Sequence, residues 1–257
     1  MDNKLSVCIE MLFSDLPFLE RIERTAALGF SGVEFWGWQD KDLAEIHQKI
    51  TELDLELAAF AGSNTPLNDP TKTESAVLDI KKSIATGQKL DVRNIIITVG
   101  QALEDVPHTK QHDNIIEVLQ KAAPTAEAAG ITLVLEPLNT VVDHQGYYLA
   151  SSYEGYEILE AVNSPRVKML FDIYHQQITE GNIIENITEH IELIGHFHLA
   201  DVPGRQEPGT GELNYANILS AVDKTDYDGF VGCEFRPSGS SEKALDYVQE
   251  LNKGRIK

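Results

Sequence analysis

ITLVLE at residues 131–136 is a short apolar run that ends in a carboxylate, and three similar runs follow it: VKMLFD (167–172), GHFHL (195–199) and FVGCEF (230–235). Near their ends stand Glu136, Asp172, His198 and Glu234, which are 36, 26 and 36 residues apart. Each interval has room for one helix and the return to a neighbouring parallel strand. Because parallel neighbours end at the same edge of a sheet, the spacing predicts that these side chains meet there and share one divalent cation.

The whole chain repeats this alternation of strand and helix. Eight β-rich runs are LSVCIEML (5–12), GVEFWGW (32–38), LELAAFAG (55–62), NIIITVG (94–100), ITLVLEP (131–137), VKMLFDI (167–173), GHFHLA (195–200) and FVGCEF (230–235). Between them apolar residues recur at spacings of three and four, as in 43–53, 77–84, 183–194 and 244–251, which predicts helices. Eight strands and eight helices predict an α/β fold, a (β/α)8 TIM barrel, over a single domain of residues 1–257.

Three long irregular segments each follow a predicted strand. They span residues 62–72, 100–110 and 203–214. Active sites of (β/α)8 barrels lie at the C-terminal ends of the strands. These segments are therefore predicted to lie on the catalytic face.

The composition argues against several classes of partner. Lys and Arg total 21 against 41 Asp and Glu, a net charge of −20, and such a surface repels nucleic-acid phosphates. No signal peptide is recognised, and there is no run of about 18 apolar residues that would span a membrane. Cys8 and Cys233 lie in apolar runs, which favours buried thiols in a reducing cytoplasm over a disulfide scaffold. The sequence therefore predicts a cytoplasmic protein without a nucleic-acid or membrane partner.

The four strand-end residues have the donor atoms of a divalent-cation site. Mg2+ and Mn2+ prefer carboxylate oxygens, and an imidazole extends the choice to Co2+ or Zn2+. Side chains alternate along a strand, so His198 is expected to share a face with His196, and Glu234 with Gly232. A lone buried carboxylate is costly, and several that converge require a compensating cation. As a set they are more typical of a metal site than of ordinary polar residues at the ends of strands.

Four longer phrases resemble the signature segments of the hydroxypyruvate isomerase family, which belongs to the xylose-isomerase-like TIM barrels. They are EPLNTVVDHQGYYL, FDIYHQQITEG, GHFHLADVPGRQEPGTGELNY and GCEFRP. The resemblance implies that Glu136, Asp172, His198 and Glu234 bind the metal, and that the two glutamates also act as acid and base. Many hydroxypyruvate isomerases carry Gln at the position of His198, whereas related ketose epimerases carry His.

Three further residues are predicted to contact the substrate. His175 lies in the phrase FDIYH, and the matching histidine of the resembled superfamily contacts a substrate oxygen. Arg205 lies in the loop PGRQEPGTGE, where a bidentate guanidinium would suit a substrate carboxylate. Glu34 ends the second predicted strand and is predicted to bind a substrate hydroxyl. The nearby Trp36 and Trp38 are expected either to close the pocket or to contact another subunit, which leaves a homo-oligomer open.

The predicted activity is metal-assisted interconversion of hydroxypyruvate and 2-hydroxy-3-oxopropanoate (tartronate semialdehyde), or of a related 2-oxo sugar acid. A proton next to the carbonyl would leave, an enediolate would form, and a proton would return at the neighbouring carbon. The alternatives are a ketose 3-epimerase or an inosose dehydratase-like enzyme on a neutral sugar, and a barrel that binds sugar acids without turnover. The charge of −20 and the sparse ligand set argue against an apurinic endonuclease, which needs several zinc ions held by many histidines.

Overall fold

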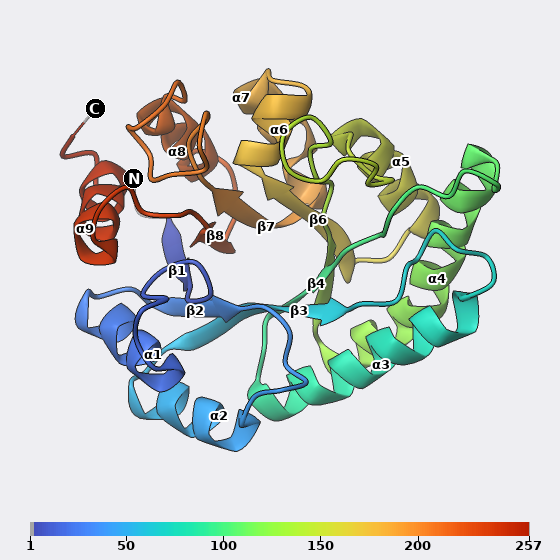
Figure 1. Ribbon diagram of the computed structural model, residues 1–257, viewed down its shortest axis with the longest axis horizontal. Helices are drawn as coiled ribbons and strands as arrows, with labels where there is room; N and C mark the ends of the chain where they lie inside the picture. The colour runs from blue at the N-terminus through green and yellow to red at the C-terminus, as the bar shows by residue number, and fades with distance from the viewer. Residues whose placement is uncertain (1–2, 257) are drawn as a thin grey trace.

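The computed structural model describes residues 3–256, which form a closed barrel of eight parallel strands. Each strand pairs with the next, and β1 pairs with β8 to close the ring (Figure 1). The strands are β1 (Lys4–Cys8), β2 (Gly32–Phe35), β3 (Glu56–Ser63), β4 (Asn94–Ile97), β5 (Thr132–Leu135), β6 (Val167–Asp172), β7 (Ile194–Leu199) and β8 (Phe230–Cys233). The predicted TIM barrel is confirmed. The predicted domain boundaries at residues 1 and 257 lie outside the described residues.

Helices surround the barrel and cover the outer face of its strands (Figure 1). Within residues 3–256 the α-helices are α1 (Phe18–Ala27), α2 (Leu43–Glu52), α3 (Thr73–Leu90), α4 (His108–Ala129), α5 (Ser152–Val162), α6 (Ile173–Thr179), α7 (Ile183–His190), α8 (Tyr215–Asp223) and α9 (Ser241–Asn252). This is one more than the eight predicted, because α6 begins directly after β6. The carboxylate of Asp172 caps α6 by accepting a hydrogen bond from the backbone N–H of Tyr174 at 2.8 Å.

One predicted helical stripe ends earlier than expected. Helix α7 stops at His190, a 3-10 turn η1 (Ile191–Leu193) follows, and Ile194 opens strand β7. The prediction of a helix across 183–194 was therefore wrong at its end. Ile194 is buried in β7, and an apolar stripe of a helix would also predict burial, so its apolar character alone did not distinguish the last turn of a helix from the first residue of a strand.

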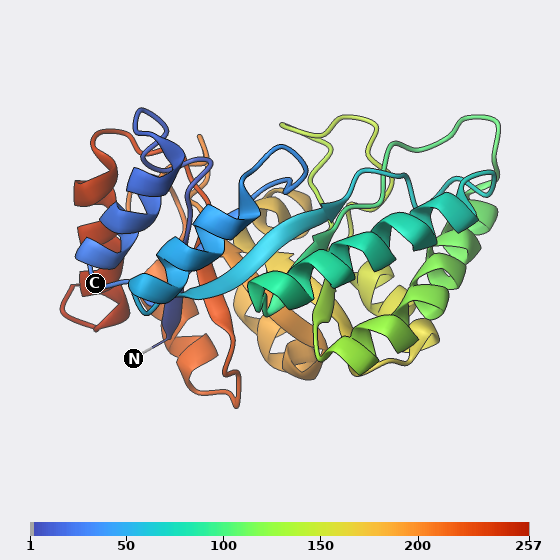
Figure 2. The same ribbon diagram turned by 90° about the horizontal axis from the view of Figure 1, so that it is seen from below.

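The connections that follow the strands gather at one end of the barrel, toward the top of Figure 2. Five of them are at least nine residues long, and they span residues 9–17, 64–72, 98–107, 136–151 and 200–214. The prediction that the long irregular segments follow strands is confirmed. This end of the barrel carries the polar residues described below, as in other (β/α)8 barrels.

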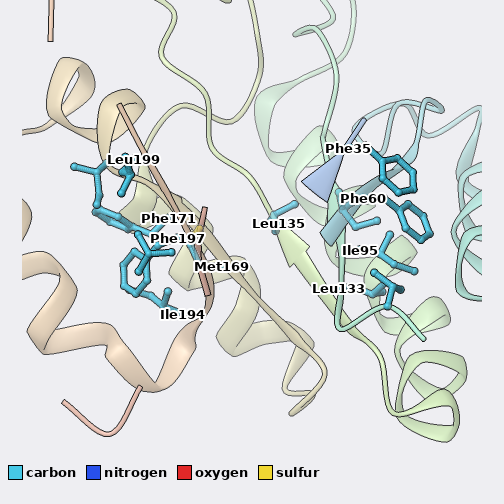
Figure 3. Close-up of a cluster of buried hydrophobic side chains, with 14 of the residues drawn as sticks. Phe35, Phe60, Ile95, Leu133, Leu135, Met169, Phe171, Ile194, Phe197 and Leu199 are labelled. Atoms are coloured by element: carbon cyan, nitrogen blue, oxygen red, sulfur yellow. The ribbon is translucent and has the colours of Figure 1, made fainter. Parts of the chain in front are cut away.

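The main apolar core lies between the strands and the helices. Figure 3 shows part of it, with Phe35 stacked on Phe60 on one side and Phe171 against Phe197 on another. Side chains alternate along a strand, so these residues face outward while their neighbours in sequence face into the barrel. Burial of this layer holds the helices on the barrel and leaves the barrel interior to a different set of side chains.

The interior of the barrel is apolar on one side only. Ala59, Ile96, Val134 and Leu170, from β3 to β6, form a small cluster there together with Ala61. The inward positions of β7, β8, β1 and β2 instead carry mainly polar residues and glycine, with Phe230 of β8 packed beside Gly32 and Ser6. A polar cluster inside a barrel requires internal hydrogen-bond partners, because water cannot supply them.

Two smaller expectations can be compared with the structure. Cys8 and Cys233 are both buried and free, as predicted. None of the helices in residues 3–256 combines the length and apolar character that a membrane crossing requires.

Candidate metal centre

The structure brings the four predicted ligands together at the C-terminal ends of adjacent strands. Asp172 ends β6 and lies directly opposite His198 of β7 in the sheet register. Glu136 and Glu234 are the residues that follow β5 and β8. One ligand atom from each residue lies within 4.8 Å of the others, and all four residues are buried. Three carboxylates and one imidazole therefore share a small volume closed off from solvent.

The ring of His198 points one nitrogen at this cluster. Its Nδ1 lies 3.2 Å from Oε2 of Glu234 and 3.8 Å from Oε1 of Glu136, yet it makes no well-aligned hydrogen bond with any described residue. Burial lowers the pKa of His198, but the charges of Glu234 and Glu34 outweigh it and raise that pKa well above its ordinary value. The surroundings of Nδ1 thus require positive charge, which either a proton or a metal ion can provide.

The two carboxylates nearest to Arg205 differ in their electrostatic surroundings. Burial raises the pKa of Asp172, and the charges of Arg205 and His198 offset only part of the rise. Burial also acts on Glu234, but there His198 and Arg205 prevail and hold the pKa of the carboxyl well below its usual range. Arg205 and His198 therefore hold Glu234 in its ionised form more firmly than they hold Asp172.

Arg205 reaches the centre from the segment 200–214. Its Nη2 lies 2.6 Å from Oε2 of Glu234 and 3.5 Å from Oδ2 of Asp172. The guanidinium lies over the ring of Tyr174, at 5.2 Å from the ring centroid. Its Nε has no hydrogen-bond partner among residues 3–256. Arg205 therefore stands at the edge of the cluster with one donor that no described residue uses.

His175 lies beside the cluster, and hydrogen bonds from Asn139 to its Nδ1 fix the orientation of the ring. Its Nδ1 accepts hydrogen bonds from the side-chain amide of Asn139 at 2.7 Å and from the backbone N–H of Asn139 at 3.2 Å. Its Nε2 lies 3.5 Å from Oδ2 of Asp172. Burial, with a contribution from Arg205, lowers the pKa of His175 to about 4. The ring is therefore neutral at physiological pH, with Nε2–H directed toward the centre.

Glu34 does not occupy the position that the sequence suggested. It was predicted to bind a substrate hydroxyl, but it is 1% exposed and both of its oxygens are already engaged. Oε2 lies 3.0 Å from Nε2 of His196 and 2.9 Å from Nε2 of His198, and Oε1 accepts the hydroxyl hydrogen bond of Ser6. Glu34 therefore lies beneath the cluster and contacts a predicted ligand instead of the open face.

Trp36 and Trp38 have different surroundings in the structure. Trp36 donates its indole N–H to Oε1 of Glu234 at 3.1 Å and is 46% exposed, so it borders the cluster. Trp38 is partly buried and donates its indole N–H to the hydroxyl of Ser83 at 3.2 Å. Of the two, only Trp36 is placed to contact a molecule bound at the centre.

Asp201 organises the segment that carries Arg205. Its Oδ1 accepts hydrogen bonds from the backbone N–H groups of Val202 and Leu213, and its Oδ2 from those of Gly209 and Gly211, all at 2.8–3.0 Å. A Cβ on Gly211 would lie 2.6 Å from Oδ1 of Asp201, so glycine is required for this approach. One buried carboxylate thus fixes both ends of the segment.

Three of these supporting residues were not predicted from the sequence. Ser6 lies two positions before Cys8 in β1, and strand alternation would have placed both on the same face. Asn139 and Asp201 lie in irregular backbone just after strands, where no periodicity indicates which way a side chain points. They are recognisable only once the fold brings their partners to them.

Comparison with known proteins identifies the family. The model of the xylose isomerase-like TIM barrel family matches residues 22–252. Hydroxypyruvate isomerase of Escherichia coli (strain K12) is 30% identical, over 95% of this chain and 98% of that protein. The 2-oxo-tetronate isomerase of Cupriavidus necator is 31% identical, over 94% and 95% of the two chains. A crystal structure described as AP endonuclease, family 2, from Brucella melitensis has a TM-score of 0.91 at 28% identity and covers 96% of this chain and 98% of its own. This chain therefore belongs to the xylose isomerase-like TIM barrel family.

Proposed function

We propose that this isomerase interconverts hydroxypyruvate and 2-hydroxy-3-oxopropanoate, or a related 2-oxo sugar acid, with the help of a divalent cation. The observation that carries the proposal is the buried convergence of Glu136, Asp172, His198 and Glu234, with Arg205 beside it. The relatives named for isomerases of hydroxypyruvate and of 2-oxo-tetronate support a sugar acid as substrate.

The side chains of the cluster fit a divalent cation. Three carboxylates match the oxygen preference of Mg2+ and Mn2+, while the imidazole of His198 also admits Co2+ or Zn2+. The buried Nδ1 of His198, which faces two carboxylates, fits a cation between them. When bound, such an ion supplies a Lewis acid for the carbonyl and hydroxyl oxygens of the substrate. Asp172 and His198, in the middle of the four strands, serve chiefly to hold it.

Glu136 and Glu234 are assigned to proton transfer. They extend from β5 and β8, on either side of β6 and β7, so their carboxylates flank the ligands between them. One carboxylate removes a proton from the carbon that bears the hydroxyl, which leaves an enediolate with its charge on the former carbonyl oxygen. The hydroxyl proton then moves to that oxygen, so that the hydroxyl carbon can become the new carbonyl. A proton then returns to the former carbonyl carbon, and a carboxylic acid of the same pair delivers it.

Two further residues orient the substrate. The Nε2–H of His175 donates a hydrogen bond to a substrate oxygen, since its Nδ1 is occupied by Asn139. Arg205 binds the substrate carboxylate, for which its planar guanidinium has matching geometry. Together they hold the reacting carbons against the two glutamates.

The proposal is tested by turnover in D2O, followed by NMR, with hydroxypyruvate and neutral ketoses as substrates. We expect deuterium in the product at the former carbonyl carbon, loss of activity after EDTA treatment, and recovery with Mn2+ or Mg2+. Replacing one carboxylate, Glu136→Gln, is expected to lower kcat about a hundredfold or more. The control Glu117→Gln changes an exposed carboxylate of α4 and should leave kcat unchanged. Turnover that survives Glu136→Gln, or a protein that binds no divalent ion, contradicts the mechanism.

A ketose 3-epimerase is the second candidate, and His198 is the observation that favours it, because it resembles the histidine of related epimerases. An epimerase removes and returns a proton at one carbon. In the same D2O experiment it would place deuterium at the starting stereocentre, and the label position therefore separates the two activities.

We also propose that the enzyme acts in the cytoplasm on a free small molecule. The free, buried thiols of Cys8 and Cys233 suit a reducing compartment. One similar structure is described as an endonuclease, but a net charge of −20 disfavours binding to DNA here. If labelled DNA shows no electrophoretic mobility shift with the protein at low salt, the result agrees with this proposal. Size-exclusion chromatography with light scattering would measure the oligomeric state.

A further inference from the structure

A buried carboxylate lies beneath the metal centre, and the proposed mechanism does not use it. Oε2 of Glu34 lies 2.9 Å from Nε2 of His198 and 3.0 Å from Nε2 of His196. Oε1 of Glu34 accepts the hydroxyl of Ser6. These side chains come from β1, β2 and β7, and all are buried.

The contact determines where the proton of His198 resides. An ionised carboxylate can only accept hydrogen bonds, so the Nε2 atoms of both histidines must carry hydrogen. In a neutral His198 the lone pair then lies on Nδ1, the atom that faces Glu136 and Glu234. Without such an acceptor, the tautomer with hydrogen on Nδ1 would be equally accessible and would point an N–H at the ion.

The barrel makes room for this carboxylate at a specific place. Gly232 of β8 lies opposite His198 and Ser6 in the register of the neighbouring strands. A Cβ at Gly232 would overlap Oε1 of Glu34 and would come within 2.8 Å of Cδ2 of His198. The inward positions of β8, β1 and β7 are therefore shaped around Glu34 and the ring of His198.

We propose that Glu34 is a positioning residue of the metal centre: it holds the ring of His198 with Nδ1 free to bind the ion and increases the basicity of that nitrogen. The inference rests on the proposed metal-dependent function. Carboxylates that accept the second ring N–H of a metal-bound histidine typically change metal affinity by about ten- to a hundredfold. Glu34 would act on the reaction only through His198 and would not touch the substrate.

A competing interpretation is that the lower cluster itself binds an ion. Glu34, His196 and His198 also offer three ligand atoms within 4.8 Å of one another. Both Nε2 atoms would have to lose their hydrogens for this, and His198 would have to bridge two ions. The competing interpretation requires two ions per chain, whereas the positioning role requires one.

The test is calorimetric titration of the metal-free full chain with Mn2+. The variant Glu34→Gln keeps the shape of the side chain and an oxygen toward the histidines but removes the charge. We expect one Mn2+ per chain in the unchanged protein and a Kd about tenfold higher in Glu34→Gln. The matched control Glu117→Gln makes the same change at an exposed carboxylate of α4, so its Kd should stay within about threefold of the unchanged protein.

A second measurement does not depend on the folding of any variant. Long-range 1H–15N NMR of the Zn2+-loaded, unchanged protein should show His198 bound through Nδ1, with a slowly exchanging hydrogen on Nε2. Zn2+ on Nε2 would overturn the positioning role. The role is also overturned if Glu34→Gln binds Mn2+ as tightly as the unchanged chain, or if two ions bind and Glu34→Gln loses one. A chain that binds no Mn2+ and no Zn2+ at all would instead overturn the proposed function.

Discussion

Asn139 donates its side-chain amide to Nδ1 of His175 across 2.7 Å, and its backbone N–H reaches the same nitrogen across 3.2 Å. Two donors on one imidazole nitrogen require a lone pair there, so the hydrogen is carried by Nε2. Among residues 3–256, Nε2 has no hydrogen-bond partner. A residue outside the predicted ligand set thus determines that Nε2 of His175 can act only as a hydrogen-bond donor.

Replacing Asn139 by Asp should reverse this arrangement. A carboxylate beside Nδ1 accepts a hydrogen bond, which favours the tautomer without hydrogen on Nε2. We expect kcat/KM to fall about a hundredfold, the size of effect typical for loss of one well-placed donor. Asn139→Ala keeps the backbone donor and should lose only about tenfold. Steady-state kinetics measures both, and equal losses in the two variants would argue that Asn139 matters only for packing.

Removal of the guanidinium of Arg205 should separate acids from neutral sugars. Arg205→Gln is expected to lower kcat/KM for hydroxypyruvate by about ten- to a hundredfold, because a hydrogen bond to a charged group is lost. Neutral ketoses, if turned over at all, should be affected far less. Arg236→Gln alters an exposed arginine of the same face and serves as the control. An equal loss of kcat/KM on acids and on neutral ketoses would mean that Arg205 acts on the carboxylates of the cluster and does not bind the substrate carboxylate.

Asp201→Asn should loosen the segment 202–213 without direct contact with the ligands. The amide nitrogen of Asn would face two backbone N–H donors where Oδ1 or Oδ2 of Asp201 now accepts. We expect Tm to fall by about 10 °C, given loss of about two hydrogen bonds to a charged group. Faster hydrogen exchange should appear at Gly209 and Gly211. Asp246→Asn, on the exposed face of α9, is the matched control, and similar exchange in both variants would refute the role of Asp201.

The hydrogen bonds of Asp143 should make part of the stability depend on pH. Burial raises the pKa of this carboxyl, but donors from Asn139 at 2.9 Å and Tyr174 at 2.8 Å prevail and lower it. Its stabilisation is therefore full above the unfolded-state pKa of about 3.9 and is lost as the pH falls through the lower pKa of the folded state. The Tm difference between Asp143→Asn and the unchanged chain should be largest near neutral pH and should shrink below about pH 4. Thermal unfolding across this range measures it, and a constant difference would contradict the prediction.

The sequence predicted the fold well because its strongest signals are periodic. Each strand is short and apolar, each helix has one apolar stripe, and both patterns are local. The prediction was wrong for Ile194 because an apolar residue suits either element. Gly130 shows the opposite case: it ends α4 in the left-handed conformation, with φ of 73°, as a glycine between a helix and a strand predicts.

The residues of the candidate site that stand at strand ends were predictable from the sequence. The hydrogen-bond partners that are distant in the sequence were not. The four ligands came from strand ends, which topology places on one rim. Glu34 also stands near a strand end, yet it points to His198, 164 residues away, instead of to the open face. Gly232, at an inward position of β8, leaves it the space to do so, and glycine carries no sequence signal of what it accommodates.

The residues that support the candidate metal centre come from both sides of the junction at which β1 pairs with β8. All four predicted ligands belong to the C-terminal half of the chain. Ser6, Glu34 and Trp36, which support two of them, lie in or directly after the first two strands. A half-barrel made only of β5 to β8 would contain every ligand and still lack the groups that orient them. The centre is therefore a property of the completed ring, and an ion bound there would stabilise ring closure as a whole rather than either half.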